Sequence, residues 1–170
     1  GRSADQVRQV LGERVEYAEQ AEQLGTGHAL AQAQPLLAGR AGTILVLYGD
    51  TPLIRGATLS ALLELHAAWQ PAITMLTAVA ADPSGYGRIL RDERGRVAGI
   101  VEEASASPEQ RAIGEVNSGV YCFRAEWLWP RLERLQLSPK GEYYLTDLVG
   151  QAVAEGEAVE AIKLPEATEA

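Results

Sequence analysis

The sequence predicts an α/β protein with a mainly parallel sheet that is covered by helices on both faces. Apolar, β-rich runs alternate with runs of helical periodicity, an arrangement that aligns successive strands in parallel. A length of 170 residues fits one compact domain. A composition of 46% hydrophobic and 22% charged residues is typical of a globular protein.

The N-terminal part predicts a surface helix, a short strand and the start of a second helix. Ser3 and Gln6 form a capping-box start, and apolar residues recur at helical spacing until Gly12 ends the helix. Residues 15–19 alternate apolar and polar side chains, which predicts a strand. The glycine loop at residues 25–27 then opens a helix, with its threonine as the N-cap.

The stretch TILVLYGDTPLI, at residues 43–54, organises the predicted sheet. Its apolar residues 44–48 run directly into Gly49 and Asp50, which predicts a fully buried central strand. Ligands of open α/β sheets bind at such strand ends. Gly49 lets a ligand approach the backbone closely, and Asp50 offers a hard oxygen suited to Mg²⁺. Taken alone, the Gly-Asp pair is more typical of an ordinary turn.

The rest of the chain continues the alternation. Apolar residues at positions 59, 62 and 63 predict a helix with His66 at the edge of its apolar stripe, a structural position. Pro130 predicts a broken or late-starting helix within residues 124–135. A last helix is expected around residues 145–152. Three further strands are expected at residues 73–80, 119–123 and 159–164. Residues 88–91 and 96–102 are expected to form an antiparallel hairpin.

Charge and cysteine content exclude several classes of partner. A net charge of -8 leaves no basic stripe for a phosphate backbone, so nucleic-acid binding is not expected. The sequence contains no apolar run long enough to span a membrane. Cys122 is the only cysteine, which rules out an intrachain disulfide and fits a reducing cytoplasm; its apolar flanks predict a small buried hydrophobe.

Several runs occur in a fixed order along the chain. They are QAEQLGTGHA at residues 20–29, YGD at 48–50, DPSGYGRIL at 82–90, GIVEE at 99–103, EVNSGVY at 115–121 and GEYYLTDL at 141–148. Together they closely resemble the uridyltransferase (pyrophosphorylase) domain of the bacterial bifunctional N-acetylglucosamine-1-phosphate uridyltransferase/glucosamine-1-phosphate acetyltransferase. The resemblance covers essentially the whole chain.

This resemblance implies a Rossmann-like nucleotide-diphospho-sugar transferase fold that is truncated at both ends. Residues 1–170 are then an internal part of a single nucleotidyltransferase domain, without its N-terminal glycine-rich loop and without the C-terminal acetyltransferase domain. The implied reaction is uridylyl transfer from UTP to N-acetylglucosamine 1-phosphate, with Mg²⁺ as cofactor. It yields UDP-N-acetylglucosamine, a precursor of peptidoglycan and lipopolysaccharide, and pyrophosphate. The resemblance is compatible with a homo-oligomer in the full-length protein.

The resemblance also assigns roles to individual residues. Those that match uracil-binding positions are Gln20, Gly25 and Thr26. Those that match the ribose and phosphate segment are Tyr48, Gly49 and Asp50, with Asp50 as catalytic residue and magnesium ligand. Those that match positions around the amino sugar are Gly87, Glu102, Asn117, Tyr144 and Thr146. Without the resemblance, Gly25 and Thr26 read as a capped helix, and Thr146 or Asp147 as a helix cap.

Two departures from the family pattern keep alternatives open. The glycine-rich triphosphate loop is absent, so the chain alone is expected to be inactive. Ala104 and Ser105 replace the usual Lys-Asp pair, which removes a positive charge near the sugar phosphate. Both favour a catalytically inactive, pyrophosphorylase-like binding or regulatory module, which the intact uracil and sugar segments oppose. A pyrophosphorylase for another nucleotide sugar shares the fold.

Overall fold

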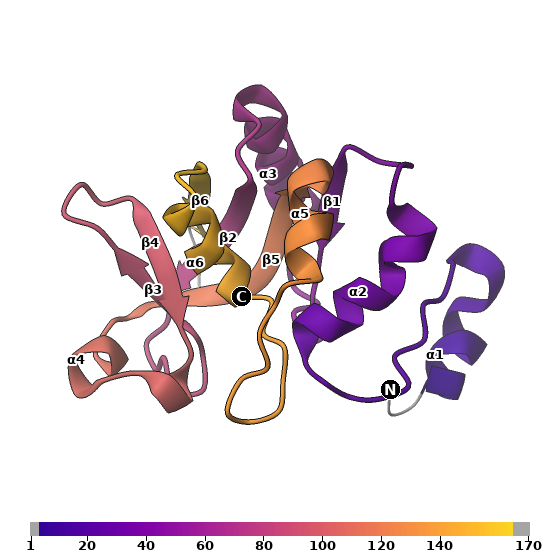
Figure 1. The fold of residues 1–170 in the computed structure, drawn as a ribbon, viewed down its shortest axis with the longest axis horizontal. Helices are drawn as coiled ribbons and strands as arrows, with labels where there is room; N and C mark the ends of the chain where they lie inside the picture. Colours follow the sequence, from indigo (N-terminus) through magenta and orange to yellow (C-terminus); the bar gives the residue numbers. More distant parts are fainter. Residues whose placement is uncertain (1–3, 165–170) are drawn as a thin grey trace.

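The computed structural model describes residues 4–164, which form one six-stranded sheet with helices on both faces (Figure 1). The strands are β1 (Thr43–Val46), β2 (Ile73–Val79), β3 (Arg88–Arg91), β4 (Val97–Val101), β5 (Glu115–Arg124) and β6 (Val159–Lys163). The α-helices are α1 (Ala4–Leu11), α2 (Thr26–Leu37), α3 (Gly56–Trp69), α4 (Pro108–Arg111), α5 (Ala125–Leu132) and α6 (Asp147–Ala154). Gly12–Arg14 and Glu103–Ser105 are short 3₁₀ turns.

The central strand is β5, not the predicted strand at residues 44–48. β5 pairs with β2 along one edge. Its other edge pairs with β3 at Val116 and with β1 from Tyr121 to Arg124. β1 is shorter than predicted and only partly buried. Because β1 and β3 take different parts of the same edge, the stretch of β5 between them is left open to a ligand.

The α/β class is confirmed, but strand directions depart from the expected mainly parallel sheet. β2 and β6 are parallel, whereas β5 is antiparallel to β1, β2 and β3, and β3 is antiparallel to β4. β1, β2 and β6 therefore share one direction, as strand–helix alternation predicts. The difference arises because β5 returns between β1 and β2.

Two apolar clusters bury the two faces of the sheet. Tyr121 and Phe123 of β5 join residues of α5 and α6 in one cluster. Val120 and Cys122, which alternate with them, join Leu62 of α3 in the other. This alternation follows from the two-residue period of a strand. Figure 1 shows the β3–β4 hairpin at one end of the molecule and α1 at the other. No helix within residues 4–164 is long and apolar enough to cross a membrane.

Three local expectations differ from the structure, and one lies outside it. Residues 15–19 are irregular, and the Tyr17 hydroxyl there donates to the Gly12 carbonyl at 2.6 Å, so their alternating pattern joins no sheet. The last helix before residue 135 starts directly at Ala125 and includes Pro130, because burial of its tryptophans holds it against the core. His66 is buried, not at a stripe edge, and its Nδ1 lies 2.8 Å from Thr74 Oγ1. The capping serine, Ser3, is outside the described residues.

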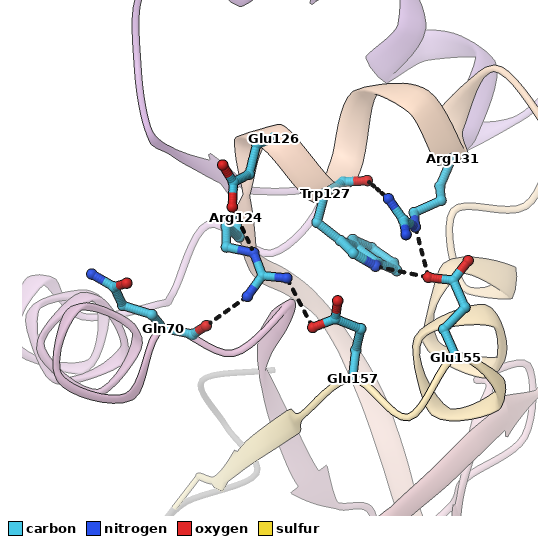
Figure 2. A network of polar contacts seen from close by, with 7 residues as sticks. All are labelled: Gln70, Arg124, Glu126, Trp127, Arg131, Glu155 and Glu157. Atoms are coloured by element: carbon cyan, nitrogen blue, oxygen red, sulfur yellow. Dashed lines mark hydrogen bonds and ion pairs between the residues drawn. The ribbon is translucent and has the colours of Figure 1, made fainter.

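A polar network anchors the segment that follows α6 (Figure 2). Arg124 donates to the Gln70 carbonyl at 3.1 Å and to Glu157 at 2.8 Å. Glu155 accepts hydrogen bonds from Arg131 at 2.7 Å and from the indole of Trp127 at 3.1 Å. The network ties the C-terminal end of α6 to β5 and α5.

Candidate active site

A cleft of about 670 Å³ opens where β1 and β3 separate along β5. Ten of the eleven site residues expected from the sequence line it, and Gly49 does not. The ten are Gln20, Gly25, Thr26, Tyr48, Asp50, Gly87, Glu102, Asn117, Tyr144 and Thr146. They come from distant parts of the chain, so the fold itself brings them together. We call the first three the α2 side of the cleft, and the last five the sheet side.

The α2 side is built on the glycine loop that precedes α2. Gly25 has φ +94, and a Cβ there would lie 2.7 Å from the Tyr143 carbonyl oxygen, so only glycine fits. The backbone of residue 27 donates to the same carbonyl at 2.8 Å. Gln20 Nε2 donates to the Gly25 carbonyl at 3.0 Å and lies 3.1 Å from His28 Nδ1. His28 therefore has a structural role beside the loop, and its contact helps to hold Gln20 in place.

Thr26 is not the N-cap that the sequence predicted. Gly25 occupies the N-cap position of α2, and Thr26 is the first helical residue. The Thr26 hydroxyl instead accepts a hydrogen bond from the backbone N–H of Leu145 at 3.1 Å. Its side chain thus joins α2 to the segment that leads into α6, across the cleft.

On the sheet side, side chains from β5, from the residue after β4 and from the residue before α6 converge. The Thr146 hydroxyl donates to Glu102 Oε1 at 2.7 Å. Thr146 occupies the N-cap position of α6 but its side chain forms no cap hydrogen bond, and Asp147 is the first helical residue, which corrects the capping expectation. The Asn117 side-chain oxygen accepts a hydrogen bond from the Gly119 N–H at 3.1 Å, and the backbone N–H of Asn117 donates to the Gly87 carbonyl at 2.9 Å. A carboxylate and an amide are thereby fixed in one wall.

Tyr48 forms the floor of the cleft where β1 ends. Burial, and then the negative charges of Glu102 and Asp50, raise the pKa of its phenol, so the hydroxyl stays protonated. The ring packs near Tyr121, with 6.3 Å between ring centroids. Gly119 approaches Tyr48 so closely that a Cβ at that position would lie 2.5 Å from a ring carbon. Tyr48 is therefore confined by the backbone of β5.

Asp50 is one of three carboxylates that line this cleft, with Glu102 and Glu142, and it is the one expected from the sequence to hold a metal ion. Among residues 4–164 there is no cluster of three or more His, Cys, Asp or Glu side chains with metal-binding geometry. Mg²⁺, however, is commonly held by one or two carboxylates together with substrate phosphates. The Asp50 carboxylate, in the turn that follows β1 and on the lining of the cleft, fits that kind of shared site.

The cleft also contains residues that the sequence did not single out. They are Gln23, Ala29, Thr51, Gly85, Tyr86, Ser118, Gly119 and Glu142. All of them lie one to three positions from a predicted residue, so adjacency along the chain was the available signal. Cys122 lies in the core, where burial raises the pKa of its thiol to about 11. It is the buried hydrophobe that was expected.

Comparison with known proteins shows which family this chain belongs to. The family model described as nucleotidyl transferase matches residues 4–167. The chain belongs to the nucleotidyl transferase family. The resemblance to the uridyltransferase domain that the motifs indicated is thereby confirmed. Enzymes of this family generally use a divalent metal ion.

Individual relatives in this family are similar over nearly the whole chain. The bifunctional protein GlmU of Brevibacillus brevis is 51% identical over 160 residues, which are 94% of this chain and 35% of that protein. The bifunctional protein GlmU of Enterococcus faecalis is 47% identical over 171 residues, 100% of this chain and 37% of that protein. The chain therefore spans little more than a third of these relatives.

Proposed function

We propose that this chain forms the substrate cleft of a uridylyltransferase that converts UTP and N-acetylglucosamine 1-phosphate into UDP-N-acetylglucosamine and pyrophosphate. One observation carries the proposal. The residues that match the uracil-binding and the sugar-binding positions line the same cleft as Asp50. Its volume of about 670 Å³ lies within the range of small-molecule sites, roughly 300–1,000 Å³.

In this proposal the α2 side takes the nucleotide. An amide side chain such as Gln20 pairs with the donor and acceptor groups of a uracil edge. The backbone of Gly25 and Thr26 approaches the base closely because no side chain of the loop intervenes. The N-terminal end of α2 adds a partial positive charge beside the anionic ligand.

The sheet side then takes the amino sugar. Glu102 is acceptor-only when ionised and suits sugar hydroxyls, and Asn117 suits the acetamido group. Pairing these partly buried groups with a ligand discriminates against sugars that leave them unpaired. A phosphate oxygen of the sugar phosphate attacks the α-phosphorus of UTP, a new P–O bond forms, and the bond to the departing pyrophosphate breaks. Positioning of the two substrates is the contribution of this chain's residues.

The charge of the cleft sets a requirement on this reaction. Its described lining residues include the carboxylates of Asp50, Glu102 and Glu142, and neither Lys nor Arg. Two anionic substrates must therefore be neutralised by other cations. Asp50 would hold Mg²⁺, which when bound supplies the positive charge that offsets the phosphates. We further propose a cytoplasmic location, since UTP is a cytosolic nucleotide, and residues 1–170 as an internal part of one nucleotidyltransferase domain.

A chimera tests the proposal. The matching segment of the Brevibacillus brevis relative would be replaced by this chain, and pyrophosphate release from UTP and N-acetylglucosamine 1-phosphate would be measured with Mg²⁺. We expect turnover within about tenfold of the parent, as for a site with intact substrate contacts, and none from the 170-residue chain alone. A folded chimera that binds UDP-N-acetylglucosamine without turnover would instead identify an inactive binding module. Preference for another nucleotide or sugar phosphate would reassign the substrate.

A further inference from the structure

An arginine is buried directly behind one wall of the cleft. Arg88, the first residue of β3, is 2% exposed. Its guanidinium donates to Glu103 Oε2 at 2.7 Å and to the backbone carbonyl of Tyr86. The same Glu103 oxygen accepts a hydrogen bond from the Gly85 N–H at 3.0 Å. Arg88 and Glu103 thus hold two consecutive residues of the wall, although neither lines the cleft itself.

The wall has few other constraints. Gly85 and Gly87 flank Tyr86, and glycine leaves the backbone wide conformational freedom. The other backbone hydrogen bonds of this wall in the described residues run from Tyr86 to the Pro83 carbonyl, at 3.2 Å, and from residue 117 to the Gly87 carbonyl, at 2.9 Å. The conformation of Gly85 therefore depends on the Glu103 carboxylate.

The pair is chemically suited to a fixed position. A buried guanidinium is stable only when it is paired and hydrogen-bonded, and its planar fork holds a carboxylate in a defined geometry. The hydrogen bond from Arg88, followed by that from the Gly85 N–H, lowers the pKa of Glu103 and keeps it ionised. The two contacts are charge-assisted and therefore stronger than neutral hydrogen bonds.

Holding Glu103 also holds the residue before it. Glu102 lines the cleft and accepts from Thr146 at 2.7 Å. The 3₁₀ turn Glu103–Ser105 begins directly after Glu102, and the Ser105 N–H donates to the Glu102 carbonyl at 2.9 Å. Displacement of Glu103 would therefore move Glu102 as well as the wall at Gly85.

We propose that Arg88 and Glu103 are positioning residues for the sheet side of the cleft. They hold the Gly85–Gly87 wall and Glu102 in the arrangement that receives the sugar. The inference rests on the proposed function in taking the sugar as the ligand of this wall. Loss of the pair weakens contacts to the sugar and leaves contacts to the uridine nucleotide on the α2 side intact.

The same strand offers a matched control. Arg91, three residues further along β3, also forms an ion pair with a glutamate, Glu115, at 2.6 Å. It also donates to the Gly95 carbonyl in the hairpin turn, at 2.7 Å, and neither Arg91 nor Glu115 lines the cleft. Arg91→Ala therefore removes a comparable ion pair from β3 without touching the wall.

The test compares two ligands on the 170-residue chain by calorimetry. UDP-N-acetylglucosamine reports on the whole cleft and UMP on its nucleotide side. Arg88→Ala and Glu103→Ala should each weaken UDP-N-acetylglucosamine binding by about tenfold or more and leave UMP binding within about twofold. Arg88→Lys, which keeps the charge without the fork, should recover part of the loss. Arg91→Ala should change neither affinity.

Equal losses for both ligands, or the same loss in Arg91→Ala, would overturn the inference. Glu103→Ala carries the test if Arg88→Ala does not fold, because Glu103 is partly exposed. Hydrogen exchange at the Gly85 amide separates this inference from the proposed function. If the parent chain binds no UDP-N-acetylglucosamine, the proposed function fails. Faster exchange at Gly85 in Glu103→Ala than in Arg91→Ala would still support the positioning role, and equal exchange would reject it.

Discussion

Substitution of Gly119 by alanine tests how the floor of the cleft is built. Gly119 has φ +76, a left-handed conformation that costs a residue with a Cβ about 1–2 kcal/mol. The new methyl carbon would also lie 2.5 Å from Tyr48 Cδ2 and 2.8 Å from its Cγ. Because carbon atoms in contact are normally separated by about 3.5–4.0 Å, the ring must move by roughly 1 Å. Tyr48 lines the cleft, so the displaced ring changes the ligand space.

Gly95 provides the control for backbone strain. It also has φ +76, but a Cβ there would have no atom within 4 Å. Gly95→Ala should therefore lose only about 1–2 kcal/mol of unfolding free energy, the left-handed penalty. Gly119→Ala should lose about 1–3 kcal/mol more, the typical cost of overpacking.

The assay is urea denaturation combined with titration of UDP-N-acetylglucosamine. Gly119→Ala should bind the ligand at least about tenfold more weakly than Gly95→Ala. The overpacked Tyr48 ring lines the cleft, and a loss of about 1.4 kcal/mol or more in binding free energy corresponds to that factor. Equal stability losses and unchanged affinity in both variants would refute the reasoning, because they would show that Tyr48 adjusts without entering the cleft.

Three further predictions concern charge. In the chimera, Asp50→Asn should lower turnover by about a hundredfold or more without changing the melting temperature, because a neutral amide binds Mg²⁺ less well than a carboxylate. An unchanged Mg²⁺ dependence would show that Asp50 has only a structural role in its turn. The hydrogen bond from Arg91, the largest cause, lowers the pKa of Glu115 from 4.5 to about 2. The stabilisation that the Glu115 carboxylate gives the fold is therefore fully present above pH 4.5 and is lost as the pH falls toward 2. Glu115→Gln should lower the unfolding free energy, measured by urea denaturation, by about 2 kcal/mol at pH 7 and by less at pH 3. The same difference at both pH values would contradict this. Ala104 is exposed, and Arg88 is already paired with Glu103. Ala104→Lys should therefore raise kcat/KM for the sugar phosphate only about two- to fivefold at low salt. A gain that persists at high salt would argue against an electrostatic origin.

Elements with a clear local pattern were predictable from the sequence. The β-rich run at residues 73–80, the hairpin around Gly95 and the apolar face of α6 are present where periodicity and turn residues indicated. Strand order was not, because pairing depends on contacts between distant segments. The run at residues 44–48 is as apolar as a central strand, yet the ten-residue β5 occupies the centre and pairs on both edges.

The same division holds for the candidate site. Gln20, Asp50 and Asn117 were found through short runs that carry a family resemblance, and the fold brings them into one cleft. Gly119 and Arg88 stand in such runs too, but their contacts are visible only in three dimensions. Gly119 matters because the segment after β1 brings Tyr48 against it, and Arg88 because the turn that follows β4 brings Glu103 against it.

The most direct test of the central claim is a titration of the ¹⁵N-labelled chain observed by NMR. UDP-N-acetylglucosamine should shift the amide signals of Gly25 and Thr26 on the α2 side and those of Gly87 and Asn117 on the sheet side. UMP should shift only the first pair. Signals that shift outside the cleft, or a sheet side that responds to UMP as strongly as to the sugar nucleotide, would contradict the proposal that nucleotide and sugar occupy opposite sides of one site.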